Sequence, residues 1–165
     1  MANKVYITNE QKTVKIPSGT RLLIRRACNA VIEVEQFPHQ VEVSVTLTDN
    51  EGIKKLNTEY RDKPTETDVL SFPQFTPEEG YTENPETGLV LLGDIVISME
   101  KAMEQAKEFN HSLQREVAYL TVHSMLHLLG YDHEDGGIEQ VRMREREELV
   151  LSKLGLQRGY NYVND

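Results

Sequence analysis

The chain has 165 residues, of which 38% are hydrophobic and 27% charged, and 18 Lys and Arg against 27 Asp and Glu give a formal net charge of -9. This composition predicts one folded domain over residues 1–165 and excludes a disordered chain. No run of about 18 apolar residues occurs, so we expect no membrane span. The first residues also lack the apolar stretch of a secretory signal, which makes a cytoplasmic protein the default expectation.

The charge is distributed unevenly along the chain. Residues 1–63 have a balance of +2, whereas residues 64–165 have a balance of -11. A net charge of -9 by itself argues against nucleic acid as a partner. The basic residues of the first part are either solvated surface charges or a local positive face. They include Arg21, Arg25, Arg26, Lys54, Lys55, Arg61 and Lys63.

Strands and helices are predicted to alternate through the first half of the chain. Apolar residues recur at helical spacing after residue 18, where Ser18 or Thr20 is the expected N-cap. Apolar and polar residues alternate after residue 40, which is typical of a half-exposed strand. The predicted elements are a strand at 5–8, a helix at 18–36, a strand at 41–47, a helix from Asp49 or Asn50 toward residue 60, and a brief strand at 68–72.

The second half begins with an acidic segment, residues 74–88, whose prolines and glycines predict an exposed loop. The helix expected at 112–129 is apolar on nearly every face, so we expect it to be buried on most sides. The other predicted elements are a strand at 89–98, a helix at 99–109 capped by Ser98, and a final, mostly exposed helix at 138–154. Together these elements predict an α/β or α+β fold with one sheet.

Three of the five histidines lie within eleven residues, at positions 123, 127 and 133. His123 and His127 are four residues apart, so one face of a helix presents both imidazoles to a single metal ion. Gly130 is placed to end that helix, which lets the chain turn back and bring His133 to the same ion. Three nitrogen ligands leave a position for water, as in catalytic sites. The single Cys28 excludes a cysteine-based zinc site.

The histidine spacing matches the metzincin pattern H-E-x-x-H-x-x-G-x-x-H, except that Ser124 replaces the glutamate. That glutamate is the general base of peptide hydrolysis, so the geometry of a metzincin-like helix is predicted without its proteolytic chemistry. Two structural interpretations stay open. The histidines at 123 and 127 are hydrogen-bonded core residues with His133 at the surface, or the site is a closed structural one with Asp132 as its fourth ligand.

Two further positions are candidates for the site. Arg61 presents a fork of donors that matches phosphate, and Lys63 adds a second charge, although an arginine beside acidic residues is also typical of a surface ion pair. Gly93 and Asp94 interrupt an apolar strand. They indicate either a site carboxylate or a β-bulge with a structurally hydrogen-bonded aspartate.

Four blocks of the sequence together resemble the YbeY family of bacterial metal-dependent endoribonucleases. They are 57–61, the Thr-Asp-Val-Leu-Ser-Phe-Pro of 67–73, the Leu-Gly-Asp-Ile-Val-Ile-Ser of 92–98, and 123–133 with its Gly-Tyr-Asp-His ending. These blocks occur in the family's order, and nothing is carried over to the acidic segment 74–88 or to the C-terminal tail.

The resemblance implies a mixed four-stranded sheet flanked by helices and one zinc ion held by His123, His127 and His133. It further implies a single-strand-specific endoribonuclease that matures the 3' end of the small-subunit ribosomal RNA and acts in ribosome quality control. The expected partners are RNA, the ribosome or its small subunit, and an assembly GTPase. Arg61 is carried over as the positive residue needed for RNA cleavage, and His123 is expected to be catalytic as well as a ligand.

The chemistry expected from these residues is Lewis-acid activation by the metal, with Arg61 stabilising negative charge on the phosphoryl oxygens. Two other functions stay open. One is a different metal-dependent hydrolase, protease-like, whose base would be Asp94 or Asp132. The other is a non-catalytic ribosome-assembly factor whose metal only holds the fold. Nitrogen ligands suit zinc, nickel, cobalt and copper, so the spacing does not select the metal.

Overall fold

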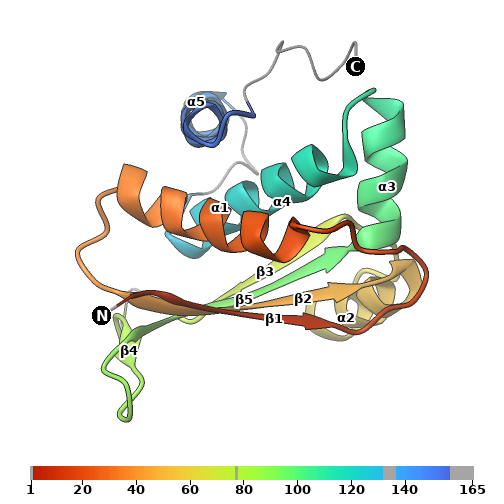
Figure 1. Ribbon diagram of the computed structural model, residues 1–165. Coiled ribbons are helices and arrows are strands. Elements are labelled where there is room, and N and C mark those ends of the chain that lie inside the picture. Colours follow the sequence, from red (N-terminus) through yellow and green to blue (C-terminus); the bar gives the residue numbers. More distant parts are fainter. Residues whose placement is uncertain (1, 77, 132–136, 157–165) are drawn as a thin grey trace.

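A mixed sheet built from the β-prone runs of the sequence forms the centre of the fold (Figure 1). The computed structural model describes residues 2–76, 78–131 and 137–156. Four strands lie in the order β1-β2-β5-β3, with β1, β2 and β5 parallel and β3 antiparallel to β5. Their bounds are β1 Lys4–Asn9, β2 Val41–Thr48, β3 Val69–Pro73 and β5 Val90–Ser98.

The predicted four-stranded sheet is confirmed, with one addition. A two-residue strand, β4 (Thr82–Glu83), pairs antiparallel with the start of β5, inside the segment predicted to be an exposed loop. Two residues carry too little periodicity to be recognised in the sequence. Both residues of β4 are exposed, so the segment is nevertheless at the surface, as predicted.

Helices cover both faces of the sheet unequally (Figure 1). On one face α1 (Thr20–Val34) and α4 (Leu113–Leu128) lie side by side, with α3 (Met99–Glu108) beside α4. The helix α5 (Gly137–Lys153) packs on α1 and α4. On the other face α2 (Asn50–Arg61) packs on β5 and β3. The arrangement is the predicted α+β fold.

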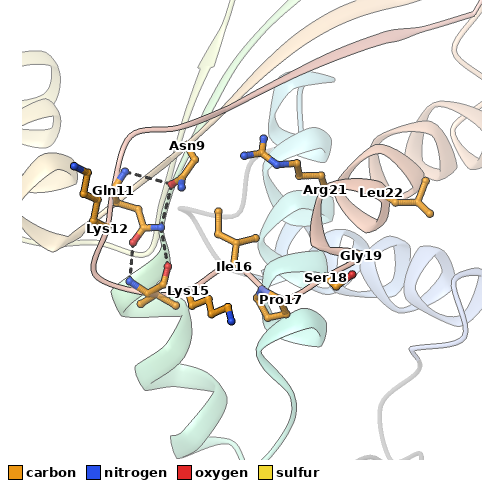
Figure 2. Close-up of a pocket in the computed structure, with 11 residues that line it drawn as sticks. Asn9, Gln11, Lys12, Lys15, Ile16, Pro17, Ser18, Gly19, Arg21 and Leu22 are labelled. Atoms are coloured by element: carbon orange, nitrogen blue, oxygen red, sulfur yellow. Dashed lines mark hydrogen bonds between the residues drawn. The ribbon is translucent and has the colours of Figure 1, made fainter.

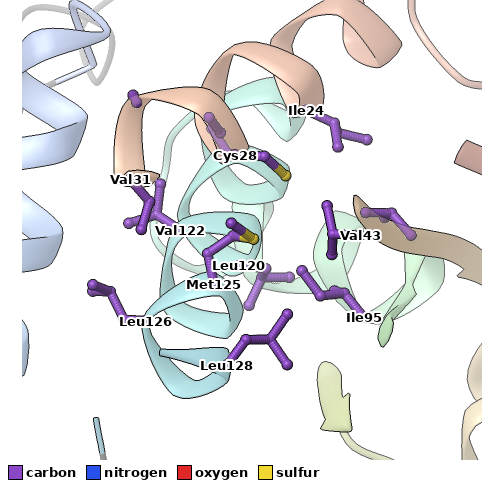
Figure 3. Packing of buried hydrophobic residues seen from close by; sticks show 14 of the residues in the cluster. Ile24, Cys28, Val31, Val43, Ile95, Leu120, Val122, Met125, Leu126 and Leu128 are labelled. Carbon is purple, nitrogen blue, oxygen red and sulfur yellow. The ribbon is translucent and has the colours of Figure 1, made fainter. Parts of the chain in front are cut away.

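The main core lies between the sheet and the pair α1 and α4 (Figure 3). Ile24 and Val31 of α1 meet Val43 of β2, Ile95 of β5 and the apolar faces of α4. Each large aliphatic side chain buried there contributes about 1.5–3 kcal/mol to stability. A smaller cluster under α2 comprises Ile53, Leu70 and Val96 with the partly buried Leu56 and Phe72.

Local capping interactions determine where three of the helices begin. Asp49, Ser98 and Ser112 each accept a hydrogen bond from the backbone N–H three residues on, at 2.8, 3.2 and 3.0 Å. These contacts confirm the predicted starts of α2 and α3. The side-chain cap predicted for α1 is wrong, because Gly19 occupies the N-cap position with a φ of 88° and no side-chain bond is made there.

Gly93 lies at a β-bulge, as one of the two interpretations of the Gly-Asp pair predicts, while the hydrogen-bonded role of Asp94 in that interpretation stays a prediction. The register between β2 and β5 shifts between Glu42 and Val43, and Gly93 has a φ of 144°. A Cβ atom at this position would lie 2.4 Å from the carbonyl oxygen of Phe72 and 3.0 Å from Leu128 Cδ2. Only glycine therefore lets β3 and α4 approach β5 so closely.

No helix among the described residues is long and apolar enough to cross a membrane.

We expect Gly93→Ala to lower the free energy of unfolding by at least about 2 kcal/mol, because the methyl group adds a clash with backbone to the strained φ. The measurement is urea denaturation followed by circular dichroism. Gly88→Ala is the matched control, since Gly88 has a φ of 75° but nothing within 4 Å of an added Cβ. Equal losses for the two variants would contradict the steric explanation.

Candidate metal and catalytic site

A cavity of about 520 Å³ opens between the C-terminal part of α4 and the edge strand β3. It contains two of the predicted metal ligands together with the predicted catalytic arginine, although Arg61 lies on α2, far away in the sequence. The lining residues are Arg61, Thr67, Asp68, Val69, Ser71, Pro73, His123, His127, Gly130 and Tyr131. The sheet and α4 thus bring together His123, His127 and Arg61.

The pleat of β3 explains which of its side chains reach the cavity. Val69, Ser71 and Pro73 alternate with Leu70 and Phe72, which belong to the cluster under α2. Among the described strands β3 pairs with β5 alone, so it is an edge strand, where a proline at the end is tolerated. One face of β3 therefore forms a wall of the cavity, while the other face anchors α2.

Burial leaves only one stripe of α4 open. Within residues 117–128 every residue is buried except Tyr119, His123 and His127, which are half-buried. These three positions are four residues apart and therefore lie above one another on the helix surface. The prediction of a helix buried on most sides is confirmed, and both histidines lie on its open stripe.

Each of the two imidazoles is held through its Nδ1 atom. His127 Nδ1 lies 2.8 Å from the backbone oxygen of Tyr131, and His123 Nδ1 contacts a carboxylate oxygen of Glu147 on α5. A carbonyl oxygen and an ionised carboxylate only accept hydrogen bonds, so Nδ1 is the donor in both contacts. A neutral imidazole protonated at Nδ1 has its lone pair on Nε2.

The two Nε2 atoms lie 3.2 Å apart. Two nitrogen lone pairs at this separation repel each other unless a cation or a proton lies between them. Two ligands of a tetrahedral zinc ion, each at about 2.0–2.1 Å, would be separated by about 3.3 Å. The two nitrogens therefore fit a metal ion, whereas two core histidines would need a proton on one Nε2 atom that is shared with the other.

The remaining candidate ligands lie outside the described residues. His133 and Asp132 both fall in the interval between residues 131 and 137. Within the described ranges no group of three or more His, Cys, Asp or Glu side chains is placed to hold a metal. The third ligand therefore stays a prediction, as does the closed site with Asp132.

Ser124 occupies the position where metzincins carry their catalytic glutamate, and here it has a packing role. Its side chain is fully buried, and its Oγ is hydrogen-bonded to Ser71 Oγ on β3. This contact ties α4 to the strand that forms the cavity wall. Ser124 itself is not among the residues that line the cavity, although its partner Ser71 is.

The turn after α2 brings Arg61 to the cavity. Asn57 is almost completely buried. Its side-chain nitrogen donates to the backbone carbonyl of Thr65 at 3.0 Å, and its backbone carbonyl accepts from the Lys63 N–H at 3.2 Å. These bonds brace residues 62–65, which lead from α2 to β3. Arg61 is the last residue of α2, where a cation also interacts favourably with the helix dipole.

Asp68 is a cavity residue to which the sequence analysis assigned no role. Its carboxylate accepts the backbone N–H of Val69 at 2.7 Å and the side-chain amide of Gln105 at 3.3 Å. These bonds fix the carboxylate at the edge of the cavity.

Burial raises the pKa of the neighbouring Tyr119 to about 12, and the charges of Glu147, Glu116 and Asp68 add to the effect. Tyr119 therefore keeps its proton at neutral pH.

Asp94 is not brought to the histidines. It pairs in register with Phe72 and lies two residues from Val96, and both of these belong to the cluster under α2. Because side chains alternate along a strand, Asp94 lies on the face of the sheet opposite to α4. The protease-like alternative with Asp94 as base is therefore not supported by the structure.

Glu147 was missed in the sequence analysis, which predicted a mostly exposed last helix. It is only 5% exposed and shares a buried stripe of α5 with Met143, Val150 and Leu151. An acidic residue on the apolar stripe of a helix is a signal for a buried polar contact, and that signal was available in the sequence.

A second cavity, of about 660 Å³, lies between the end of β1 and the start of α1 (Figure 2). Its wall includes Lys12, Lys15 and Arg21 but no histidine or carboxylate. Gln11 closes the loop by donating to Asn9 at 3.0 Å and to the Val14 carbonyl at 2.9 Å. This cavity is basic but carries no group suited to catalysis, so the histidine cavity is the candidate site.

The predicted basic residues do not form one positive face. Arg21, Arg25 and Arg26 lie on α1, whereas Lys54, Lys55 and Arg61 lie on α2. These helices cover opposite faces of the sheet (Figure 1). Among these basic residues only Arg61 lines the histidine cavity.

We expect Ser124→Ala to lower the free energy of unfolding by about 1 kcal/mol, the value of one hydrogen bond. Zinc affinity should stay within twofold of the unsubstituted protein, because the hydroxyl is bonded to Ser71 and is not part of the cavity lining. Chemical denaturation and competition with a chromogenic chelator measure the two quantities. A large loss of zinc affinity with unchanged stability would refute the packing role.

The fold and the site define an α+β protein with a cavity lined by two histidines and an arginine. The two imidazoles come from the buried helix α4 and are spaced as ligands of one metal ion. The family model described as "Endoribonuclease YbeY" matches residues 6–155, which is most of the chain. The chain belongs to the YbeY family.

Two relatives named "Endoribonuclease YbeY" illustrate this membership. The protein from Caldanaerobacter subterraneus subsp. tengcongensis is 53% identical over 158 residues, covering 93% of this chain and 99% of the relative. The protein from Caldicellulosiruptor bescii is 47% identical over 158 residues, covering 94% and 99%. The solution structure of TM1509 from Thermotoga maritima matches with a TM-score of 0.57 and 25% identity, covering 98% of this chain and 95% of that one.

Proposed function

We propose that this protein is a metal-dependent endoribonuclease that cleaves single-stranded RNA in the histidine cavity and acts in the maturation of ribosomal RNA. The observation that carries the proposal is that the Nε2 atoms of His123 and His127 face each other at 3.2 Å in the cavity that Arg61 also lines. The family supplies the substrate class, since its relatives are named endoribonucleases. The domain would span residues 1–165.

His123 and His127 would hold the metal, with His133 as the third ligand. Zinc is the proposed ion because the family resemblance implies it, and the separation of the two imidazole nitrogens is compatible with it. When bound, the ion supplies Lewis-acid chemistry to a phosphodiester. The protein contributes the orientation of both rings through the acceptors at Nδ1.

Arg61 would act on the phosphate. Its guanidinium carries a fixed positive charge and presents parallel donors that match two phosphoryl oxygens. Charge accumulates on these oxygens in the transition state, so an arginine on the cavity wall stabilises that state. The presence of Arg61 among the residues that line the histidine cavity supports this role.

The size of the cavity favours single-stranded RNA. A volume of about 520 Å³ is that of a pocket for one small molecule, which suits a single nucleotide of a flexible strand. Because the net charge of the chain is -9, we expect binding that is weak, and because cations contact the phosphates we expect it to fall with added salt. The basic wall of the second cavity would offer additional phosphate contacts.

The wider role follows from the family alone. We propose a cytoplasmic protein that meets the ribosome or its small subunit and an assembly GTPase, and that takes part in ribosome quality control. The alternative of an assembly factor with a purely structural metal is less well supported, because the imidazoles line an open cavity and the His123 side chain is 17% exposed.

We expect Arg61→Ala to reduce cleavage of single-stranded RNA by about 100-fold or more at equal zinc content, because it removes a transition-state donor. His127→Ala should abolish both cleavage and zinc binding. Arg25→Ala is the matched control, since it removes the same charge from the exposed surface of α1. A gel-based cleavage assay on protein of measured zinc content gives the rates.

Casein is assayed in parallel, with and without chelator, to test for protease activity. Equal RNA cleavage by the unsubstituted protein, Arg61→Ala and His127→Ala would identify a contaminating nuclease and refute the proposal. Hydrolysis of casein without cleavage of RNA would favour the protease-like alternative.

A further inference from the structure

The helix α5 places a buried carboxylate against the candidate site. Glu147 is only 5% exposed and lies between Met143 and Val150 on the packed face of the helix. A carboxylate withdrawn from water is costly unless it is hydrogen-bonded. Its partner here is His123 Nδ1, 24 positions earlier in the chain. The contact therefore fixes the tautomer of this imidazole, with the lone pair at Nε2.

The residue before Glu147 is connected to the other imidazole through two intermediates. Arg146 Nε donates to one carboxylate oxygen of Glu35 at 2.6 Å, and the Tyr131 hydroxyl donates to the other oxygen at 2.6 Å. The backbone oxygen of Tyr131 in turn accepts from His127 Nδ1 at 2.8 Å. These three hydrogen bonds connect Arg146 on α5 with Glu35 at the end of α1, and Glu35 with Tyr131, which lies shortly after α4.

The Glu35 carboxylate is held by a phenol hydroxyl and by a guanidinium. The hydrogen bond to Glu35 raises the pKa of the Arg146 guanidinium, which stays charged. Glu35 therefore receives a donor on each of its two oxygens.

Other ion pairs of α5 have no such connection. Lys153 pairs with Glu33 at 2.7 Å and Arg142 with Glu139 at 3.7 Å, and all four side chains are between 44% and 69% exposed. Pairs of that kind contribute little to stability. The two interactions that lead to imidazoles are the shorter and more deeply buried ones, and they come from adjacent residues.

We propose that α5 is a positioning helix for the site: Glu147 orients His123 directly, and Arg146 orients His127 through Glu35 and Tyr131. The inference rests on the metal site of the proposed function, while the tautomers that it assigns exist without metal. Arg146 and Glu147 are positioning residues, since neither lines the cavity. Docking of α5 would thereby set the affinity of the site for its ion.

The experiment measures zinc affinity by chelator competition and imidazole tautomers by ¹⁵N NMR of the metal-free protein. Glu147→Ala should weaken zinc binding by about 10- to 100-fold, and Glu147→Gln by less, because its amide oxygen still accepts from Nδ1. The Nδ1-protonated signature of His123 should give way to a mixture of tautomers in Glu147→Ala. Glu145→Gln, an exposed change on the same helix, is the matched control and should stay within twofold.

The relay has its own test. Arg146→Met and Tyr131→Phe should each weaken zinc binding a few-fold, and the double variant should be no weaker than the weaker single variant, because the two side chains act in series. Additive losses would mean that they act independently and would overturn the relay.

Thermal unfolding of every variant separates positioning from general stability. A folded Glu147→Ala variant with zinc affinity within twofold and an unchanged His123 tautomer would overturn the proposal. If Glu147→Ala fails to fold, Glu147→Gln and its tautomer signature decide the question. Failure of the unsubstituted protein to bind zinc would refute the metal of the proposed function, and the tautomer measurement would still test the role of Glu147.

Discussion

The candidate site depends on one requirement: a half-buried imidazole must have a partner for each ring nitrogen. In this protein His123 and His127 both use Nδ1 for an acceptor within the fold, a carboxylate in one case and a backbone carbonyl in the other. Both lone pairs therefore lie on Nε2, and the helix brings these atoms to 3.2 Å. Two acceptors held so close repel each other unless a cation or a proton lies between them, and a metal ion is one such cation.

The rest of the fold places the two imidazoles in a cavity and brings Arg61 to the same cavity. The helix α4 is enclosed by the sheet, α1 and α5, so its one open stripe is the stripe of the histidines. The edge strand β3 approaches α4 through the contact of Ser71 with Ser124 and through the glycine bulge at Gly93. On its other face β3 supports α2, whose last residue is Arg61. Arg61 and the two histidines, which come from distant segments, thus line one cavity.

Features that depend on neighbouring residues could be predicted from the sequence. His123 and His127 are four residues apart, so helix geometry places them on one face. The caps at Asp49 and Ser98 are hydrogen bonds between residues three positions apart. The order and type of the main strands and helices followed from periodicity in the same way. The donor fork of Arg61 made it a candidate, but its assignment to the site needed the family resemblance, since nothing local indicates which cavity a helix end will reach.

Contacts between distant segments could not be predicted. Glu147 meets a residue 24 positions away, Tyr131 meets Glu35 across 96 positions, and Arg146 meets Glu35 across 111. Such pairs depend on how α1, α4 and α5 pack, which a single sequence does not specify. The net charge was misleading for the same reason, because it contains no information on which basic residues face the cavity.

The central claim is that the histidine pair holds the ion on which RNA cleavage depends. The most direct measurement is the initial rate of single-stranded RNA cleavage as metal-free protein is titrated with zinc, with the fold followed by circular dichroism. We expect no cleavage at zero occupancy, a linear rise that ends at one zinc per chain, and an unchanged fold. A rate that does not depend on zinc occupancy would contradict the account.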